Sequence, residues 1–264
     1  MGDPDMSFIF TIFLKTAGIL AGMMIFLEIG RRIGVRRIAR NPEGIREGVG
    51  TLEGAVFALL GLIIAFTFSG AMSRFDDRRQ LIVEESNDIG TAYLRVDLLP
   101  NASQPAVREL FRLYLDSRLE TYRLIPDMAA VNKELARSAQ LQGEIWRQSL
   151  AASQLPGAHP DAARLLLPAL NAMIDITTTR TMATKIHPPR IVFILLALLA
   201  LAGSLLAGYA MAEAKGRTWL HMLCYSLAMT AAIYVILDIE YPRMGLIRVT
   251  DLDQALIELK SIMR

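Results

Sequence analysis

The chain has 264 residues, of which 53% are hydrophobic and 20% are charged, so it is more apolar than a soluble domain, in which roughly 25% of residues are charged. This composition disfavours a soluble single-domain enzyme. The 28 basic and 26 acidic residues give a net charge of +2, too small for overall charge to attract a polyanion. One cysteine, Cys224, excludes a disulfide within the chain, and three scattered histidines argue against a metal site.

The first apolar segment, residues 8–29, has the length of a membrane-spanning helix, which needs about 20 residues. It has neither the basic start nor the small-residue cleavage site of a signal peptide, so we expect it to remain as the first span. Lys15 is a charge inside this span. Two interpretations of Lys15 are open: its side chain snorkels to the lipid headgroups, or it faces a water-filled pathway.

Residues 30–50 are predicted to form an arginine-rich loop. Six arginines lie between residues 31 and 46, against the single acidic Glu43. Interleaved apolar residues allow this segment to lie on anionic headgroups. Nucleic-acid binding is disfavoured because the segment is short, lies next to the membrane and contains no aromatic residue. The arginines expected at the headgroups are Arg31, Arg32, Arg36, Arg37 and Arg40.

Three further segments have the length and composition of membrane spans. Residues 54–73, 191–212 and 218–237 contain no charged residue. Each is long enough for a helix to cross a hydrocarbon core of about 30 Å. Residues 213–217 separate the last two spans and predict a tight hairpin.

The middle of the chain, residues 74–189, is predicted to be a water-exposed helical domain. It carries more than half of the chain's charged residues in less than half of its length. Breaks near Pro100, Pro126 and Pro156 divide it into four helices, the first continuing directly out of the second span. Two apolar stripes at helical spacing should form its core. They are Phe75, Ile82, Ile89 and Val96, and then Val107, Leu110, Phe111 and Tyr114.

The tail, residues 238–264, predicts a turn and then an amphipathic helix over 251–263, capped by Thr250 and Asp253. The chain contains no phosphate-binding loop, zinc signature or nucleophile elbow. We therefore expect no catalytic site, metal site or cofactor. The sequence predicts an all-α protein with four transmembrane helices, in which spans two and three extend into a membrane-proximal helical bundle.

Two segments resemble a known family. They are EGAVFALLGLIIAFTFSGAMSRFDDRRQLIVEESNDIGTAYLRVDLLP, which includes the second span, and LDIEYPRMGLIRVTDLDQALIEL, which follows the last one. Both resemble the bestrophin-like-domain membrane proteins, a family of unassigned function that is distantly similar to the bestrophins. Bestrophins are pentameric anion channels with four membrane helices per subunit, whose second helix lines the pore with spaced aromatic residues.

The resemblance implies roles for individual residues. Pore-facing positions would be Phe57, Ile64 and Phe68. Lys15 is a further pore-lining candidate on a separate ground, because it is a charge inside a span. The junction leaving the membrane would be Arg74, Phe75, Asp76 and Arg79. The tail pattern would be Glu240, Pro242 and Gly245, followed by the acids Asp251 and Asp253. The second span has no proline and the tail has no dense acidic cluster, so the resemblance does not extend to calcium gating.

Each of these residues also has an ordinary structural interpretation. Phe57, Ile64 and Phe68 would serve equally well as a helix-packing face, and Pro242 with Gly245 as a turn. The function we expect is a passive pathway for small ions, most of all anions, through a homo-oligomer, for which the resemblance implies five subunits. The alternative is a non-conducting sensory or scaffolding membrane protein whose helical domain binds a ligand or a partner.

The orientation follows from the arginines. Positive residues in short loops favour the cytoplasmic side, so the 30–50 loop and the second hairpin should face the cytoplasm. The helical domain would then be extracytoplasmic in the plasma (inner) membrane. Bestrophins have the opposite arrangement, with the large domain in the cytoplasm.

Overall fold

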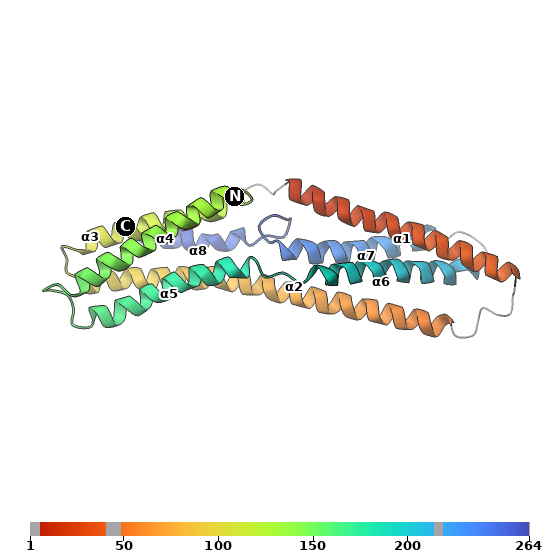
Figure 1. The fold of residues 1–264 in the computed structure, drawn as a ribbon, viewed down its shortest axis with the longest axis horizontal. Helices are drawn as coiled ribbons and strands as arrows, with labels where there is room; N and C mark the ends of the chain where they lie inside the picture. The colour runs from red at the N-terminus through yellow and green to blue at the C-terminus, as the bar shows by residue number, and fades with distance from the viewer. Residues whose placement is uncertain (1–5, 41–48, 214–218, 264) are drawn as a thin grey trace. The chain divides into compact units, whose positions relative to one another are not determined.

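The structure is a computed structural model that describes residues 6–40, 49–213 and 219–263. In these ranges every regular element is a helix, which confirms the all-α prediction. The α-helices are α1 (Met6–Arg40), α2 (Val49–Leu94), α3 (Gln104–Arg123), α4 (Met128–Ser153), α5 (Ala162–Ala183), α6 (Arg190–Ala210), α7 (Trp219–Glu240) and α8 (Gln254–Ile262) (Figure 1). Short 3-10 turns are η1 (Arg95–Leu98), η2 (Met211–Glu213) and η3 (Thr250–Asp253).

The chain divides into two compact units. The membrane unit comprises residues 6–73 and 187–241, and the bundle unit comprises residues 74–186 and 242–263. Four helices are long and apolar enough to cross a membrane: α1, the helix Gly50–Leu98, α6 and α7. The protein is therefore a multi-pass membrane protein with the predicted number of spans. The hairpin predicted at 213–217 falls, from residue 214 on, outside the described residues.

In the membrane unit, α1 packs against both α6 and α7. The approach of α1 to α6 depends on glycine. A Cβ atom at Gly30 would overlap the carbonyl oxygen of Leu205, and one at Gly208 would overlap the carbonyl oxygen of Leu27. Gly30 and Gly34 have the G-x-x-x-G spacing that lets two helix backbones approach closely in lipid. The close contact of α1 with α6 therefore requires residues without a side chain.

The part of α2 in the membrane unit buries one side of the helix. Leu60, Thr67 and Ala71 are almost fully buried, at spacings of seven and four residues. Leu60 also lies against α6, because a Cβ at Gly203 would be 3.6 Å from its side chain. This spacing is that of a single packing face on an α-helix.

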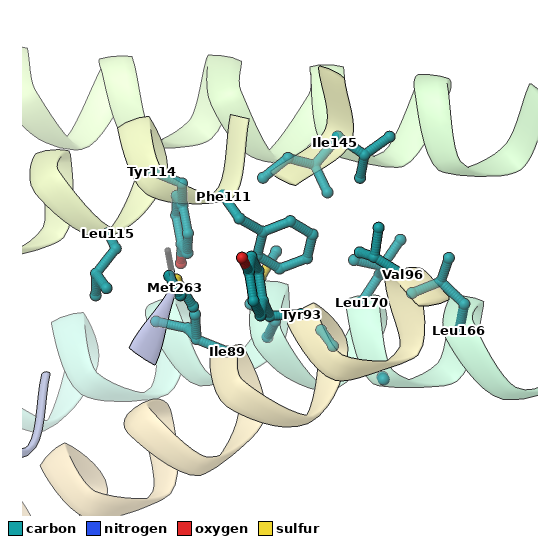
Figure 2. Close-up of a cluster of buried hydrophobic side chains, with 14 of the residues drawn as sticks. Ile89, Tyr93, Val96, Phe111, Tyr114, Leu115, Ile145, Leu166, Leu170 and Met263 are labelled. Carbon is teal, nitrogen blue, oxygen red and sulfur yellow. The ribbon is translucent and has the colours of Figure 1, made fainter. Parts of the chain in front are cut away.

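The bundle unit is built from the second half of α2, together with α3, α4, α5 and the C-terminal segment. The predicted stripe along α2 is buried, with Ile82, Ile89 and Val96 at most 1% exposed. Figure 2 shows how Ile89 and Val96 of this stripe meet side chains of the other helices in one apolar core. The partners labelled there are Phe111, Tyr114 and Leu115 of α3, Ile145 of α4, Leu166 and Leu170 of α5, and Met263 of the tail.

The C-terminal segment completes this core. Leu256 of α8 and Met263 are 0% and 2% exposed. Polar contacts hold the same segment: the Arg112 Nε donates to the carbonyl oxygen of Met263 at 2.7 Å, and the Lys260 Nζ lies 2.5 Å from the Asp116 Oδ1. The tail is thus part of the bundle core.

Two predicted boundaries of the membrane spans differ from the structure. The helix of the first span continues to Arg40, so residues 30–40, predicted as a loop, are helical. The third span is not continuous with α5, because α5 ends at Ala183 and α6 begins at Arg190. Pro188 and Pro189 cause this break, since proline donates no backbone hydrogen bond and disfavours the helical conformation of the residue before it.

Candidate functional site

One strip of the exposed surface of α2 in the membrane unit carries mostly small residues. Seven residues correspond to nearly two helical turns, so residues seven apart share a face. Gly54, Gly61 and Phe68 form one such line, and Ala58, Ala65 and Met72 form a second line beside it; all six are exposed. A Cβ at Gly54 or Gly61 would meet nothing within 4 Å. We call these six residues the outward face of α2.

The predicted pore residues share one broad face of α2, and the boundary between packed and exposed surface crosses that face. Phe57 is half-buried and lies against its own chain, with its ring edge-on to Tyr225 at a centroid distance of 6.2 Å. Ile64 is half-buried as well, whereas Phe68 is 41% exposed and belongs to the outward face. The contacts of Phe57 favour the packing interpretation at that position. A pore-facing role for Ile64 and Phe68 stays a prediction.

Lys15 is exposed on α1, while the neighbouring Ile12 and Thr16 are buried. Its side chain therefore points away from the packed side of the helix, and both interpretations of its role stay open. The predicted headgroup arginines occupy the last turns of α1, where positive charge favourably meets the negative end of the helix dipole. Of these, Arg32, Arg36, Arg37 and Arg40 are exposed and Arg31 is half-buried.

The junction residues form a local group at the start of the bundle unit. Phe75 is 8% exposed, and the Arg79 guanidinium lies 5.7 Å from the centre of its ring. The Arg79 Nη1 also donates to the Asp76 Oδ1 at 3.2 Å. Arg74 is half-buried. These contacts stay within one helix and stabilise α2 where it enters the bundle.

A buried ion-pair cluster lies inside the bundle unit, and its centre is Glu85 of α2. Glu85 is 0% exposed and accepts hydrogen bonds from the Arg118 Nε at 2.5 Å, from the Arg180 Nη1 and from the Tyr122 hydroxyl at 3.2 Å. Arg118 and Arg180 are 1% and 6% exposed. Removing one partner of such a buried ion pair would leave an uncompensated buried charge, which is strongly destabilising.

Tyr122 is surrounded by guanidinium groups. The central carbons of Arg118, Arg180 and Arg243 lie 5.2, 4.1 and 4.5 Å from the centre of its ring. These distances are in the range of cation–π attraction. Burial raises the pKa of Tyr122 to about 12, although the charges of Arg118 and Arg243 act in the opposite direction. Tyr122 is therefore neutral at physiological pH.

Burial also changes the ionisation of Arg180. Loss of solvation, followed by the nearby charge of Arg243, lowers the pKa of Arg180 to about 9, although Asp253 acts in the opposite direction. The guanidinium is still charged at neutral pH. We call Glu85, Arg118, Tyr122, Arg180, Arg243 and Asp253 the charge cluster.

The tail residues that the resemblance singled out lie in two different places. At the end of α7, Glu240 is 1% exposed and its Oε2 lies 3.3 Å from the His187 Nδ1. The His187 ring in turn stacks on Tyr241 with centroids 4.5 Å apart. Glu240 thus belongs to the membrane unit, whereas the acids that follow belong to the bundle unit.

In the bundle unit, Asp253 does not cap the last helix. Both of its carboxylate oxygens accept from the Arg243 guanidinium at 2.8 Å, and its side chain makes no capping hydrogen bond to α8. The helix begins at Gln254, three residues later than predicted, after the 3-10 turn η3 that contains Asp251. Pro242 and Gly245 lie in the irregular segment between α7 and η3, as predicted for a turn, and the Gly245 carbonyl accepts from the Arg248 Nε at 3.1 Å.

Sequence reasoning missed the charge cluster, although a signal for it was present. Arg180 continues the buried line of Leu166 and Met173 at intervals of seven residues, and Glu85 lies between Ile82 and Ile89 on the α2 stripe. A charged residue at a core position of an apolar stripe predicts a buried partner, because an isolated buried charge is strongly destabilising. Among the described residues, no group of three or more His, Cys, Asp or Glu side chains could hold a metal ion.

Comparison with known proteins gives one match. A family model, described as the bestrophin-like domain, matches residues 17–253. The chain belongs to the bestrophin-like domain family. No curated protein and no solved structure matches it.

The extent of this match shows which elements the bestrophin-like domain includes. It contains most of α1 and all of α2 to α7, so the four candidate spans and the main helices of the bundle belong to the domain. It ends at Asp253, directly before α8. Every residue of the charge cluster lies within the matched range.

Proposed function

We propose that this bestrophin-like protein assembles with copies of itself and forms a passive pathway for small anions across the membrane, with α2 next to the pathway. The observation that carries this proposal is the outward face of α2. It is exposed in the single chain, it lies in an apolar span, and both of its glycines, Gly54 and Gly61, face open space. Small residues in a membrane helix permit close approach of another helix or leave room for a pore.

Family membership supports the same proposal, because the bestrophin-like domain is distantly similar to bestrophin anion channels. The alternative is a sensory or scaffolding membrane protein that conducts nothing. The two differ in one measurable property, which is ion flux through purified protein in liposomes.

Two phenylalanines on α2 provide a matched test of the pathway. Phe66 and Phe68 are 67% and 41% exposed and point to nearly opposite sides of the helix, since each residue turns it by about 100°. Only Phe68 belongs to the outward face. Replacing Phe68 by alanine should increase chloride efflux from liposomes at least severalfold, because it removes an apolar constriction.

Phe66→Ala should leave the efflux rate unchanged and controls for the loss of an aromatic side chain from the same helix. Equal effects of the two substitutions would argue against a pathway along the outward face. No efflux above that of empty liposomes from wild-type protein would favour the sensory or scaffolding alternative.

We further propose that the arginine-rich end of α1 faces the cytoplasm in the plasma (inner) membrane and that the bundle unit is extracytoplasmic. Arginine near a span favours the cytoplasmic side. Gln154 is exposed in the loop after α4. In a Cys224→Ser background, Gln154→Cys should react with an impermeant maleimide on intact cells. Reaction only after lysis would place the bundle in the cytoplasm.

A further inference from the structure

The charge cluster of the bundle unit holds more positive than negative charge. Among the described side chains, those that meet there carry three guanidiniums and two carboxylates. They are Arg118, Arg180 and Arg243, with Glu85 and Asp253. Tyr122 is neutral, so it does not balance the surplus. A surplus positive charge in a buried site is unfavourable unless an anion compensates it.

Arg118 also has a hydrogen-bond donor that no protein group uses. Its Nε donates to Glu85 and its Nη2 donates to the Tyr122 hydroxyl. Its Nη1 carries two N–H groups, is buried, and has no partner among the described residues. The whole side chain is 1% exposed. Buried donors of this kind are rare in native proteins because leaving them unpaired is destabilising.

Two kinds of occupant would satisfy the Arg118 Nη1, namely a water molecule and an anion. A water molecule accepts the hydrogen bond but leaves the surplus charge in place, whereas an anion removes both costs. Because Arg118 and Arg180 are nearly inaccessible to solvent, the occupant must also be compact. This enclosure favours a monatomic halide over an anion with a bulky substituent.

We propose that the charge cluster binds one chloride ion per chain, held by the Arg118 Nη1 and by the surplus charge of the three guanidiniums. The arginines come from α3, from α5 and from the segment before η3, so the ion joins three parts of the bundle unit. Bound chloride would therefore stabilise the folded bundle unit, since a ligand that binds only the folded state raises the stability of that state. The proposal concerns the bundle unit alone and does not require conduction.

Thermal unfolding of the full chain in detergent tests this proposal. Sodium chloride replaces sodium gluconate at constant ionic strength. The midpoint temperature of thermal unfolding of the wild-type protein should rise with chloride concentration and then reach a plateau. Arg118→Lys keeps a positive charge beside Glu85 but removes the Nη1. Its apparent chloride affinity should be at least tenfold weaker. Arg123→Lys, at a position on the same helix where the side chain is 69% exposed, should behave as wild type.

The same chloride dependence in wild type and in Arg118→Lys, or none in wild type, would overturn the proposal. Equilibrium dialysis of the wild-type protein against radioactive chloride makes the test independent of whether the variant folds. It should give about one ion per chain. An ion on the axis of an oligomeric pore is shared by all copies, so clearly less than one ion per chain would also overturn the proposal.

Discussion

Replacing Gly30 by leucine is expected to prevent stable packing of α1 on α6. The Cβ alone would overlap the carbonyl oxygen of Leu205 and would lie 2.9 Å from its carbonyl carbon. Both atoms belong to the backbone of α6 and cannot move aside as a flexible side chain does. Overpacking of a tight interface costs typically about 1–3 kcal/mol, and we expect the upper end of this range or more. The midpoint of thermal unfolding in detergent should fall by many degrees.

Gly18→Leu is the matched control for this effect. Gly18 is on the same helix and is exposed, and a Cβ there would meet nothing within 4 Å. The midpoint of thermal unfolding of the Gly18→Leu variant should stay within a few degrees of that of the wild-type protein. If Gly30→Leu is as stable as Gly18→Leu, the close approach of α1 to α6 is not required for folding.

Replacing Glu85 by glutamine is expected to destabilise the bundle unit strongly. The substitution preserves shape but removes the carboxylate that pairs with Arg118 and Arg180. Breaking a buried ion pair by removing one partner costs about 3–5 kcal/mol, because the remaining charge is left uncompensated. Two buried guanidiniums lose a partner here. The midpoint of denaturant unfolding, followed by circular dichroism, should therefore fall markedly.

Glu84→Gln removes the same charge one residue earlier, where the side chain is exposed. An exposed carboxylate contributes about 1 kcal/mol at most. We therefore expect Glu84→Gln to unfold close to wild type. Equal stability of the two variants would show that the charge cluster does not stabilise the bundle.

The positions of the membrane spans could be predicted from hydrophobicity alone, whereas the ends of the helices could not. Residues 54–73, 191–210 and 219–237 of the predicted spans lie within helices, because charge-free runs of this length have no other stable arrangement in lipid. The ends of the helices were harder to locate. Arginine is a good helix former and is favourable near a helix C-terminus, so the basic residues after the first span continue α1 to Arg40.

Periodicity likewise predicted the core of the bundle from α2 and α3, because residues seven apart share a helix face. The charge cluster was not predicted, since Glu85 pairs with residues 33 and 95 positions later in the chain. Sequence spacing alone does not identify partners on different helices. The same limit applies to the tail, in which Asp253 pairs with Arg243 although a helix cap was expected.

The predicted pore residues show a further limit of helical spacing. Phe57, Ile64 and Phe68 lie within one broad face of α2, but the boundary between packed and exposed surface runs through that face. Phe57 contacts Tyr225, whereas Phe68 is exposed. The neighbours of α2 determine this boundary, and a single sequence does not place them. The outward face was therefore visible only once α6 and α7 were in position.

The mass and symmetry of the particle extracted in detergent test the central claim most directly. Assembly around α2 predicts a cyclic homo-oligomer with a central opening, and the resemblance to bestrophins predicts about five times the chain mass of 29.2 kDa. In images of this particle, the outward face of α2 from each copy should line or flank the opening. A monomer, or a dimer without a central opening, would contradict the proposed anion pathway.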